Sequence, residues 1–309
     1  MENPPLANKR EQSGTFESST GAELYYRDFK PAQGLDVIPL LCLHGFMRTS
    51  RDFCELGETL CAAGVRVIAP DLRGRGLSSR FEDARQYHYD LTKQDVVELL
   101  EHLDIDRVAI VGVALGAIIA QDLVAERPDL VKGIVLNDQG AEVGEASAKK
   151  MASNVENADY SWEEAVARMK SQFGETYPGL TDERWENLTW RAYRETRPGR
   201  WARDFDLKTF EDIPRLKAEH ADGWTSFLNT RGTPVAILRG ELSSYFPADC
   251  AQKMIDRHPD AVLTVVAGRG HPPLLDEPES IAALFTLLER ASDRKPDNLV
   301  SNHQRGAPR

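Results

Sequence analysis

Short apolar segments alternate with amphipathic segments along the first half of the chain. The apolar segments are four to eight residues long, as expected for strands buried in a sheet, and they comprise 22–29, 37–43, 65–69, 107–111 and 131–136. The amphipathic segments between them have helical spacing and comprise 51–63, 91–103 and 115–126. This alternation predicts an α/β fold, with a mostly parallel sheet that is covered by helices on both faces.

The alternation stops between about residues 140 and 231 and then resumes. The interrupting stretch is charged and helical in pattern, and it contains all five tryptophans of the chain. Strands are expected again at 235–238 and 261–266, with helices at 248–256 and 278–290. We therefore expect a core in two parts, 14–139 and 232–292, with a helical lid at 140–231 inserted between them. The polar ends, 1–13 and 293–309, are expected to be flexible.

Composition and charge narrow the function classes. Of 309 residues, 41% are hydrophobic and 28% are charged, which is ordinary for a globular protein. The net charge is −11 and there is no basic cluster, so neither a nucleic acid nor an anionic membrane is the expected partner. The apolar runs are too short to span a bilayer, and the first fifteen residues lack the apolar centre of a signal peptide, so we expect a cytoplasmic protein.

The four cysteines do not predict a metal site or a redox pair. They stand at positions 42, 54, 61 and 250, without metal-ligand spacing or a CxxC pair. We expect them to pack as small apolar side chains. We expect no metal and no other cofactor.

A glycine-rich turn connects the strand at 107–111 to the helix at 115–126. Its sequence, GVALG at 112–116, has the form of the G-x-S-x-G nucleophile elbow, with Ala114 at the nucleophile position. Other motifs in the same order are HGF at 44–46, DLRGRGLS at 71–78 and GRGHP at 268–272. With these motifs, the chain resembles the α/β-hydrolase family over about residues 20 to 291. The resemblance implies the α/β-hydrolase fold, with a lid over the substrate pocket.

The same resemblance indicates which residues would act. His271 matches the catalytic histidine of the family, whereas His44 matches a histidine that supports the fold. A methyl group cannot attack a carbonyl, so no acyl-enzyme can form on Ala114. Ser244 stands where many relatives have the acidic residue.

Asp138 is a second candidate for the acid. It follows the strand at 131–136. In this feature the chain resembles haloalkane dehalogenases and the cofactor-free dioxygenases that cleave quinolone rings, which have their acid at this position. A carboxylate there would hydrogen-bond Nδ1 of His271 and fix the tautomer of the ring. The alternative is that Asp138 only caps the turn that leads into the lid.

The oxyanion hole and the substrate pocket are also implied by the resemblance. The oxyanion donors would be the backbone N–H groups of Phe46 and Leu115, which need no serine side chain. Arg48, just after the oxyanion loop, is a candidate partner for a substrate carboxylate. The lid tryptophans could stack on an aromatic or apolar substrate, or could instead attach the lid to the core; those expected to line the pocket are Trp162, Trp185, Trp190 and Trp201.

Three functional hypotheses follow from these residues. The first is a cofactor-free enzyme in which a His271–Asp138 dyad acts as a general base, with a backbone oxyanion hole, on a small apolar or aromatic carbonyl compound. The second is a serine ester, lactone or amide hydrolase whose serine has been changed to alanine. The third is a ligand-binding pseudo-hydrolase without catalysis. The sequence leaves the oligomeric state open.

Overall fold

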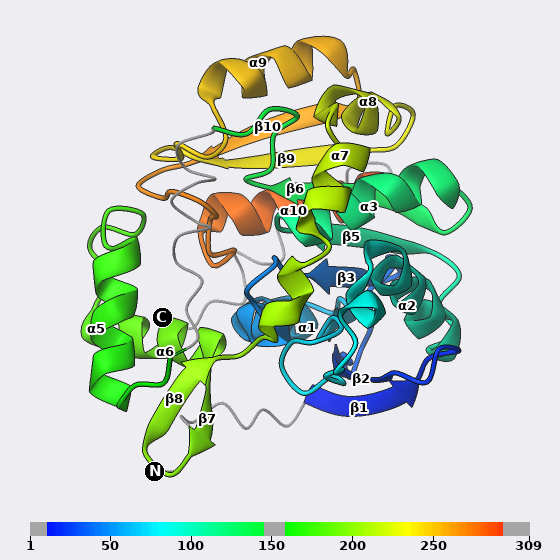
Figure 1. Ribbon diagram of the computed structural model, residues 1–309. Helices are drawn as coiled ribbons and strands as arrows, with labels where there is room; N and C mark the ends of the chain where they lie inside the picture. Colours follow the sequence, from blue (N-terminus) through cyan, green and yellow to red (C-terminus); the bar gives the residue numbers. More distant parts are fainter. Residues whose placement is uncertain (1–10, 145–157, 293–309) are drawn as a thin grey trace.

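A mostly parallel sheet forms the centre of the molecule (Figure 1). The computed structural model describes residues 11–144 and 158–292. Within these residues the large sheet has eight strands in the order β1-β2-β4-β3-β5-β6-β9-β10. The strands are β1 (Glu11–Glu17), β2 (Glu23–Phe29), β3 (Leu40–Leu43), β4 (Val67–Pro70), β5 (Val108–Gly112), β6 (Val131–Asn137), β9 (Val235–Gly240) and β10 (Ala261–Val266). β2 pairs antiparallel with both β1 and β4, and all other pairs are parallel.

Helices cover both faces of this sheet, as the alternating pattern predicts. One face packs on α1 (Cys54–Ala62) and α10 (Pro278–Ala291). The other face packs on α2 (Tyr89–His102), α3 (Leu115–Glu126) and α9 (Ala248–Arg257). Short 3-10 helices, η1 (Ser50–Phe53) and η2 (Ala84–Tyr87), precede α1 and α2. The predicted α/β-hydrolase fold class is confirmed.

The N-terminal edge of the sheet differs from the prediction. Residues 11–13 were expected in a flexible terminus, but they belong to β1, which pairs with β2 along its whole length. β1 has mostly polar side chains, and only Phe16 is buried, so it lacks the apolar pattern by which the central strands are detected. Its stability comes from backbone pairing with β2. Residues 1–10 and 293–309, the rest of the termini expected to be flexible, lie outside the described residues.

The inserted region is not wholly helical. Its helices are α5 (Trp162–Phe173), α6 (Asp182–Ala192), α7 (Ile213–Glu219) and α8 (Gly223–Leu228), with a 3-10 helix η3 (Leu207–Phe210). It also contains a β-hairpin of β7 (Tyr193–Arg197) and β8 (Arg200–Arg203), whose turn includes Gly199 with a φ of +73°. The Pro198-Gly199 pair was the available turn signal, but the polar strands beside it have no apolar alternation.

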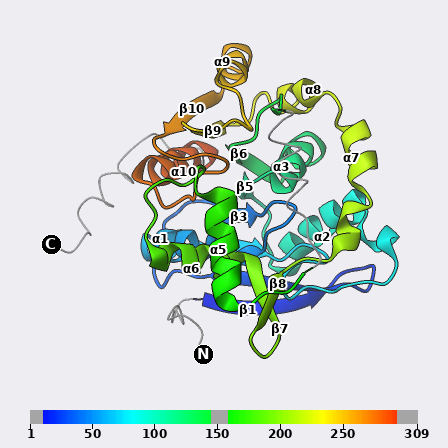
Figure 2. The same cartoon turned by 60° about the vertical axis from the view of Figure 1, so that its left-hand side comes forward.

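The described inserted region has two structurally distinct parts. The first comprises α5, α6, β7 and β8, has its own small core and is called the cap below; Figure 2 shows α5 in front of the sheet. The second comprises α7 and α8, and its Leu216 and Phe227 are buried in the main core, where α8 packs on α3. Residues 145–157, which were assigned to the lid, lie outside the described residues.

Two further observations concern the described residues as a whole. All four cysteines are buried and none of them forms a disulfide, as expected for packing side chains. Within 11–144 and 158–292, no helix is both long enough and apolar enough to cross a membrane.

Candidate active site

Ala114 lies in a tight turn between a strand and a helix. β5 ends at Gly112 and α3 begins at Leu115, so Ala114 occupies the tight strand-to-helix turn, as predicted. Its φ is +47°, a conformation that costs a residue with a side chain about 1–3 kcal/mol. A Cβ atom on Gly116 would lie 2.1 Å from the carbonyl oxygen of Leu43, so only glycine allows this close approach. The tight turn therefore places the methyl group of Ala114 at the carboxyl end of β5.

His271 and Asp138 come together although they lie 133 residues apart in the sequence. Asp138 directly follows β6, and His271 lies in the loop after β10. Nδ1 of His271 donates to Oδ2 of Asp138 at 2.9 Å, so the predicted hydrogen bond is present. Because a carboxylate can only accept, Nδ1 carries the proton of this hydrogen bond, and Nε2 is the ring nitrogen that Asp138 does not engage.

The Asp138 carboxylate is completely buried and held by two further donors. Oδ1 accepts from the backbone N–H of Gly240 at 2.8 Å, and Oδ2 accepts from the hydroxyl of Ser243 at 2.5 Å. Asp138 also has a positive φ of 56°, and its own N–H donates to the carbonyl of Leu238. Asp138 does more than cap a turn, because its carboxylate is fixed in position toward His271.

The loop after β9 supplies two neighbours of the dyad that sequence reasoning missed. The hydroxyl on Asp138 comes from Ser243, whereas Ser244, the residue at the usual acid position, lines the cavity. The ring of Tyr245 stacks on His271 with 3.9 Å between ring centroids. Burial and the charge of Asp138 raise the pKa of Tyr245 to about 12. Ser243 and Tyr245 are the chain neighbours of Ser244, and this adjacency was the sequence signal that could have identified both.

The cap is hydrogen-bonded to the loop that carries His271. The hydroxyl of Tyr177 donates to the carbonyl of Pro272 at 2.9 Å, and the N–H of Gly270 donates to the carbonyl of Thr176 at 2.8 Å. These two bonds hold the loop on both sides of His271.

The two predicted oxyanion donors border the Ala114 turn. Leu115 is the first residue of α3, and first-turn N–H groups have no acceptor within their own helix. Phe46 lines the cavity beside Gly45 and Ala114, and its carbonyl accepts from Nε of Arg75 at 3.1 Å. The positive end of the α3 dipole adds to the field at this point.

His44 has the structural role expected for it. The side chain is completely buried; its Nδ1 donates to the carbonyl of Gly45 at 2.8 Å, and its Nε2 accepts from the N–H of Leu72 at 3.0 Å. Both ring nitrogens are thus used by the backbone. Burial lowers the pKa of His44 to about 4.

This lowered pKa predicts loss of stability in mild acid. The unfolded chain protonates His44 near pH 6.5 and the folded chain only near pH 4, so the unfolded state binds more protons between these values. The contribution of His44 to the free energy of unfolding should be intact above pH 6.5 and fall by about 3 kcal/mol as the pH drops to 4. Urea unfolding at pH 7 and pH 4.5 should show that His44→Gln loses less free energy of unfolding between these pH values than wild type does. The control is His102→Gln, which replaces an exposed histidine and should lose as much as wild type. An equal loss in His44→Gln and wild type would contradict the lowered pKa of His44.

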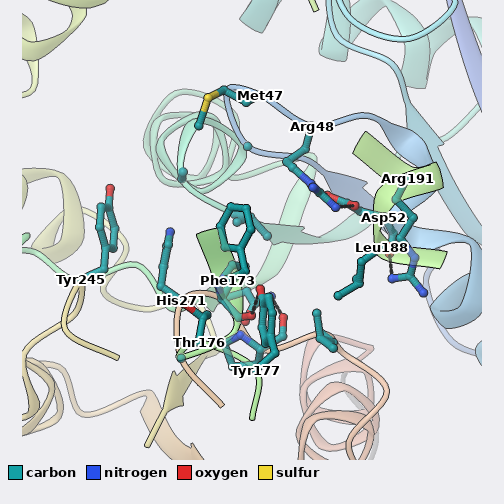
Figure 3. A pocket seen from close by; sticks show the side chains of 18 of the residues that line it. Met47, Arg48, Asp52, Phe173, Thr176, Tyr177, Leu188, Arg191, Tyr245 and His271 are labelled. Atoms are coloured by element: carbon teal, nitrogen blue, oxygen red, sulfur yellow. Dashed lines mark hydrogen bonds and ion pairs between the residues drawn. The ribbon is translucent and has the colours of Figure 1, made fainter. Parts of the chain in front are cut away.

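A cavity of about 260 Å³ lies between the sheet and the cap (Figure 3). Ala114 and His271 both line it, and its walls come from loops at the carboxyl ends of the strands and from the cap. In a doubly wound sheet this is the expected edge for a ligand. The aromatic side chains in the wall are Phe46, Phe53, Phe173, Tyr177 and Tyr245.

The prediction that tryptophans line this cavity is wrong. None of the five, all of which lie in the described residues, belongs to its wall. Instead they attach parts of the inserted region to one another and to the core. Trp162 packs on Trp201, Trp185 is buried in the cap, Trp190 lies under the guanidinium of Arg51, and Trp224 donates its Nε1–H to Glu142. Their large apolar rings are used to hold the insertion in place.

Arg48 lines the cavity as expected but is already paired. Its Nε and Nη2 donate to the two carboxylate oxygens of Asp52 at 2.8 and 2.5 Å. Two more arginines in the wall, Arg191 and Arg203, come from the cap and were not identified from the sequence. Residues 11–144 and 158–292 contain no group of three or more His, Cys, Asp or Glu side chains arranged to hold a metal ion.

Comparisons with known proteins agree with the fold. A sequence model of the alpha/beta hydrolase family matches residues 40–284. An alpha/beta hydrolase of known structure from Novosphingobium aromaticivorans is 32% identical, with a TM-score of 0.82 over 91% of this chain and 99% of that chain. A 3-hydroxybutyrate-oligomer hydrolase of Cupriavidus necator is 26% identical over 79% of this chain and 85% of its own length. Haloalkane dehalogenase 2 of Mycobacterium bovis is 27% identical over 90% of this chain and 94% of its own length.

Proposed function

Because the chain belongs to the alpha/beta hydrolase family, we propose that it is a general-base enzyme that converts a small carbonyl compound without a covalent intermediate at residue 114. The observation that supports this proposal is the 2.9 Å hydrogen bond between the buried Asp138 and His271, which lines the cavity together with Ala114. The relatives named as hydrolases support carbonyl or related small-molecule chemistry.

In the proposed mechanism, Nε2 of His271 accepts a proton from a water molecule or from the substrate. If water is deprotonated, its oxygen forms a bond to the carbonyl carbon, and the carbonyl oxygen becomes an oxyanion. The amides of Phe46 and Leu115 would donate to that oxyanion. Collapse of the intermediate breaks the bond to the leaving group, which takes the proton back from His271.

If the proton comes instead from the carbon next to the carbonyl, the same oxyanion hole would stabilise an enolate. Neither route needs a nucleophilic side chain. In both, Asp138 stabilises the imidazolium form and keeps Nε2 toward the reacting atoms. The apolar and aromatic wall of the cavity suits a substrate with an apolar or aromatic body.

A pair of proteins that differ only at residue 114 tests this proposal. Wild type should convert members of a panel of small esters, lactones and ketones, and it should remain unlabelled by a fluorophosphonate that reacts with activated serines. Ala114→Ser should become labelled, because in this proposal the tight turn, His271 and the backbone donors would activate a serine at this position. Wild-type turnover that proceeds through a covalent acyl-protein, seen by intact mass spectrometry, would reject the proposal.

The positive φ of Ala114 also favours a second candidate, a serine hydrolase in which alanine stands in place of the nucleophile. In that case wild type should be inactive on the whole panel, while Ala114→Ser hydrolyses p-nitrophenyl esters. A protein that only binds ligands would give measurable binding and no turnover in either form.

A further inference from the structure

One cationic side chain in the cavity wall has no anionic partner. Arg203 ends strand β8 of the cap and is only 9% exposed. Its Nε–H is buried and makes no hydrogen bond in the structure. In the described part of the chain, no carboxylate lies within ion-pair distance of its guanidinium. A buried charge in this situation is costly unless a ligand neutralises it.

The other two arginines that line the cavity, unlike Arg203, are each paired with a carboxylate of the protein. Arg48 is bound by both oxygens of Asp52, and Nη2 of Arg191 lies 2.7 Å from a carboxylate oxygen of Glu55. The protein thus supplies its own counter-ion for each of them. Arg203 is the arginine of this wall for which the described residues supply none.

The immediate surroundings of Arg203 are weakly polar. Its Nη1 is 3.4 Å from the sulfur of Met169, and its guanidinium lies over the ring of Tyr193 at 5.3 Å from the ring centroid. Burial, followed by the charge of Arg48, lowers the pKa of Arg203. Gln172, three residues after Met169 on α5 and therefore on the same side of that helix, also lines the cavity and has a buried amide oxygen without a partner.

The position of Arg203 relative to His271 can be followed from Arg191. Arg203 pairs in register with Tyr193 of β7, two residues after Arg191. Figure 3 shows Arg48, Asp52 and Arg191 on the side of the cavity opposite His271 and Tyr245. The cavity thus has a basic nitrogen at one end and an uncompensated cation toward the other.

We infer that Arg203 binds a carboxylate of the substrate, so that the substrate class is a carbonyl compound with an acid group remote from the reacting carbonyl. The planar fork of a guanidinium matches a carboxylate in two parallel hydrogen bonds, and Arg203 lines the cavity without a carboxylate partner among the described residues. This inference rests on the proposed function for the reacting end of the cavity, whereas the acid subsite can be measured by binding alone.

The test compares two probes that differ in charge, 4-phenylbutanoate and 4-phenylbutanamide, by calorimetric titration. Wild type should bind the carboxylate about tenfold or more tightly than the amide, as expected for a charge-assisted pair in a buried site. Arg203→Gln should remove this preference and leave the affinity for the amide within about twofold. Arg203→Lys should keep only part of the preference, because an ammonium lacks the planar fork.

Arg200→Gln is the matched control, because Arg200 lies on the same strand but pairs with Asp159 and is absent from the cavity wall. It should bind both probes like wild type. Thermal unfolding of each variant shows whether it is folded; Arg203→Gln should be at least as stable as wild type, because it no longer buries an unpaired charge.

The inference is overturned if wild type does not bind the carboxylate more tightly than the amide, or if the preference survives in folded Arg203→Gln. The same titrations on His271→Ala separate the two proposals. A carboxylate preference that persists in His271→Ala supports the acid subsite, whether or not that variant has lost turnover.

Discussion

Replacing His271 with alanine should lower kcat/KM for any substrate of the wild-type protein by about 10⁴-fold or to below detection, because the proposed general base is removed. Asp138→Asn should cost about 10² to 10⁴-fold, since an amide can present its NH2 to Nδ1 and favour the wrong tautomer of the ring. Steady-state kinetics at pH 7 to 8 on purified variants would measure both effects.

The control for these variants is Ala114→Gly. It changes the residue nearest to the proposed reaction without touching the dyad, and glycine readily adopts the positive φ at this turn. We expect turnover within a few-fold of wild type. Activity that survives in His271→Ala would reject the general-base mechanism, and an Asp138→Asn protein as active as wild type would reject the dyad.

The second large effect should be on stability, in the loop after β4. Arg73 is completely buried, and its guanidinium donates to both carboxylate oxygens of Asp95 and to the carbonyl of Gln86. Burial raises the pKa of Asp95 although the charge of Arg73 opposes this shift. Arg73→Leu leaves Asp95 buried without its counter-ion and should reduce the free energy of unfolding by about 3–5 kcal/mol. Urea unfolding at pH 7 measures the loss.

Two comparisons make this prediction specific. The double variant Arg73→Leu/Asp95→Leu should regain a large part of the loss, because it buries no unpaired charge. Arg85→Leu, which breaks a fully exposed pair with Asp83, should leave the unfolding midpoint nearly unchanged. A loss in Arg73→Leu no larger than that in Arg85→Leu would show that the buried pair does not stabilise the fold.

Prediction from the sequence succeeded where the signal is local. The helix α3 and the strand β10 have the predicted bounds, because α3 begins after a glycine-rich turn and stops before Pro128, and β10 is an apolar run between polar turns. The elbow could be recognised because five consecutive residues specify its backbone. The hairpin of β7 and β8 was missed, because polar strands are stabilised by pairing with each other, and this leaves no periodic apolar pattern.

The prediction was least accurate for the wall of the cavity. Tryptophans were assigned to it from their type and their place in the insertion, whereas the side chains that line it come from four separate loops, the end of β6 and the cap. The sequence contains no signal that identifies Arg203 as a cavity residue, since an arginine in a polar strand has the same sequence pattern whether it faces solvent or a buried cavity. Only the fold shows that its charge lacks a partner.

The sequence by itself determined the alternation of strands and helices, the elbow with Ala114, and the candidates His271 and Asp138, because each depends on residues that are close in the chain. The tertiary structure decided that Asp138 rather than a residue after β9 provides the carboxylate for His271, and that Ser243 and Gly240 hold this carboxylate. It also decided that Arg48 is neutralised by Asp52 while Arg203 is not. These outcomes depend on distances between side chains from separate elements, which are set by how the sheet and the cap pack together.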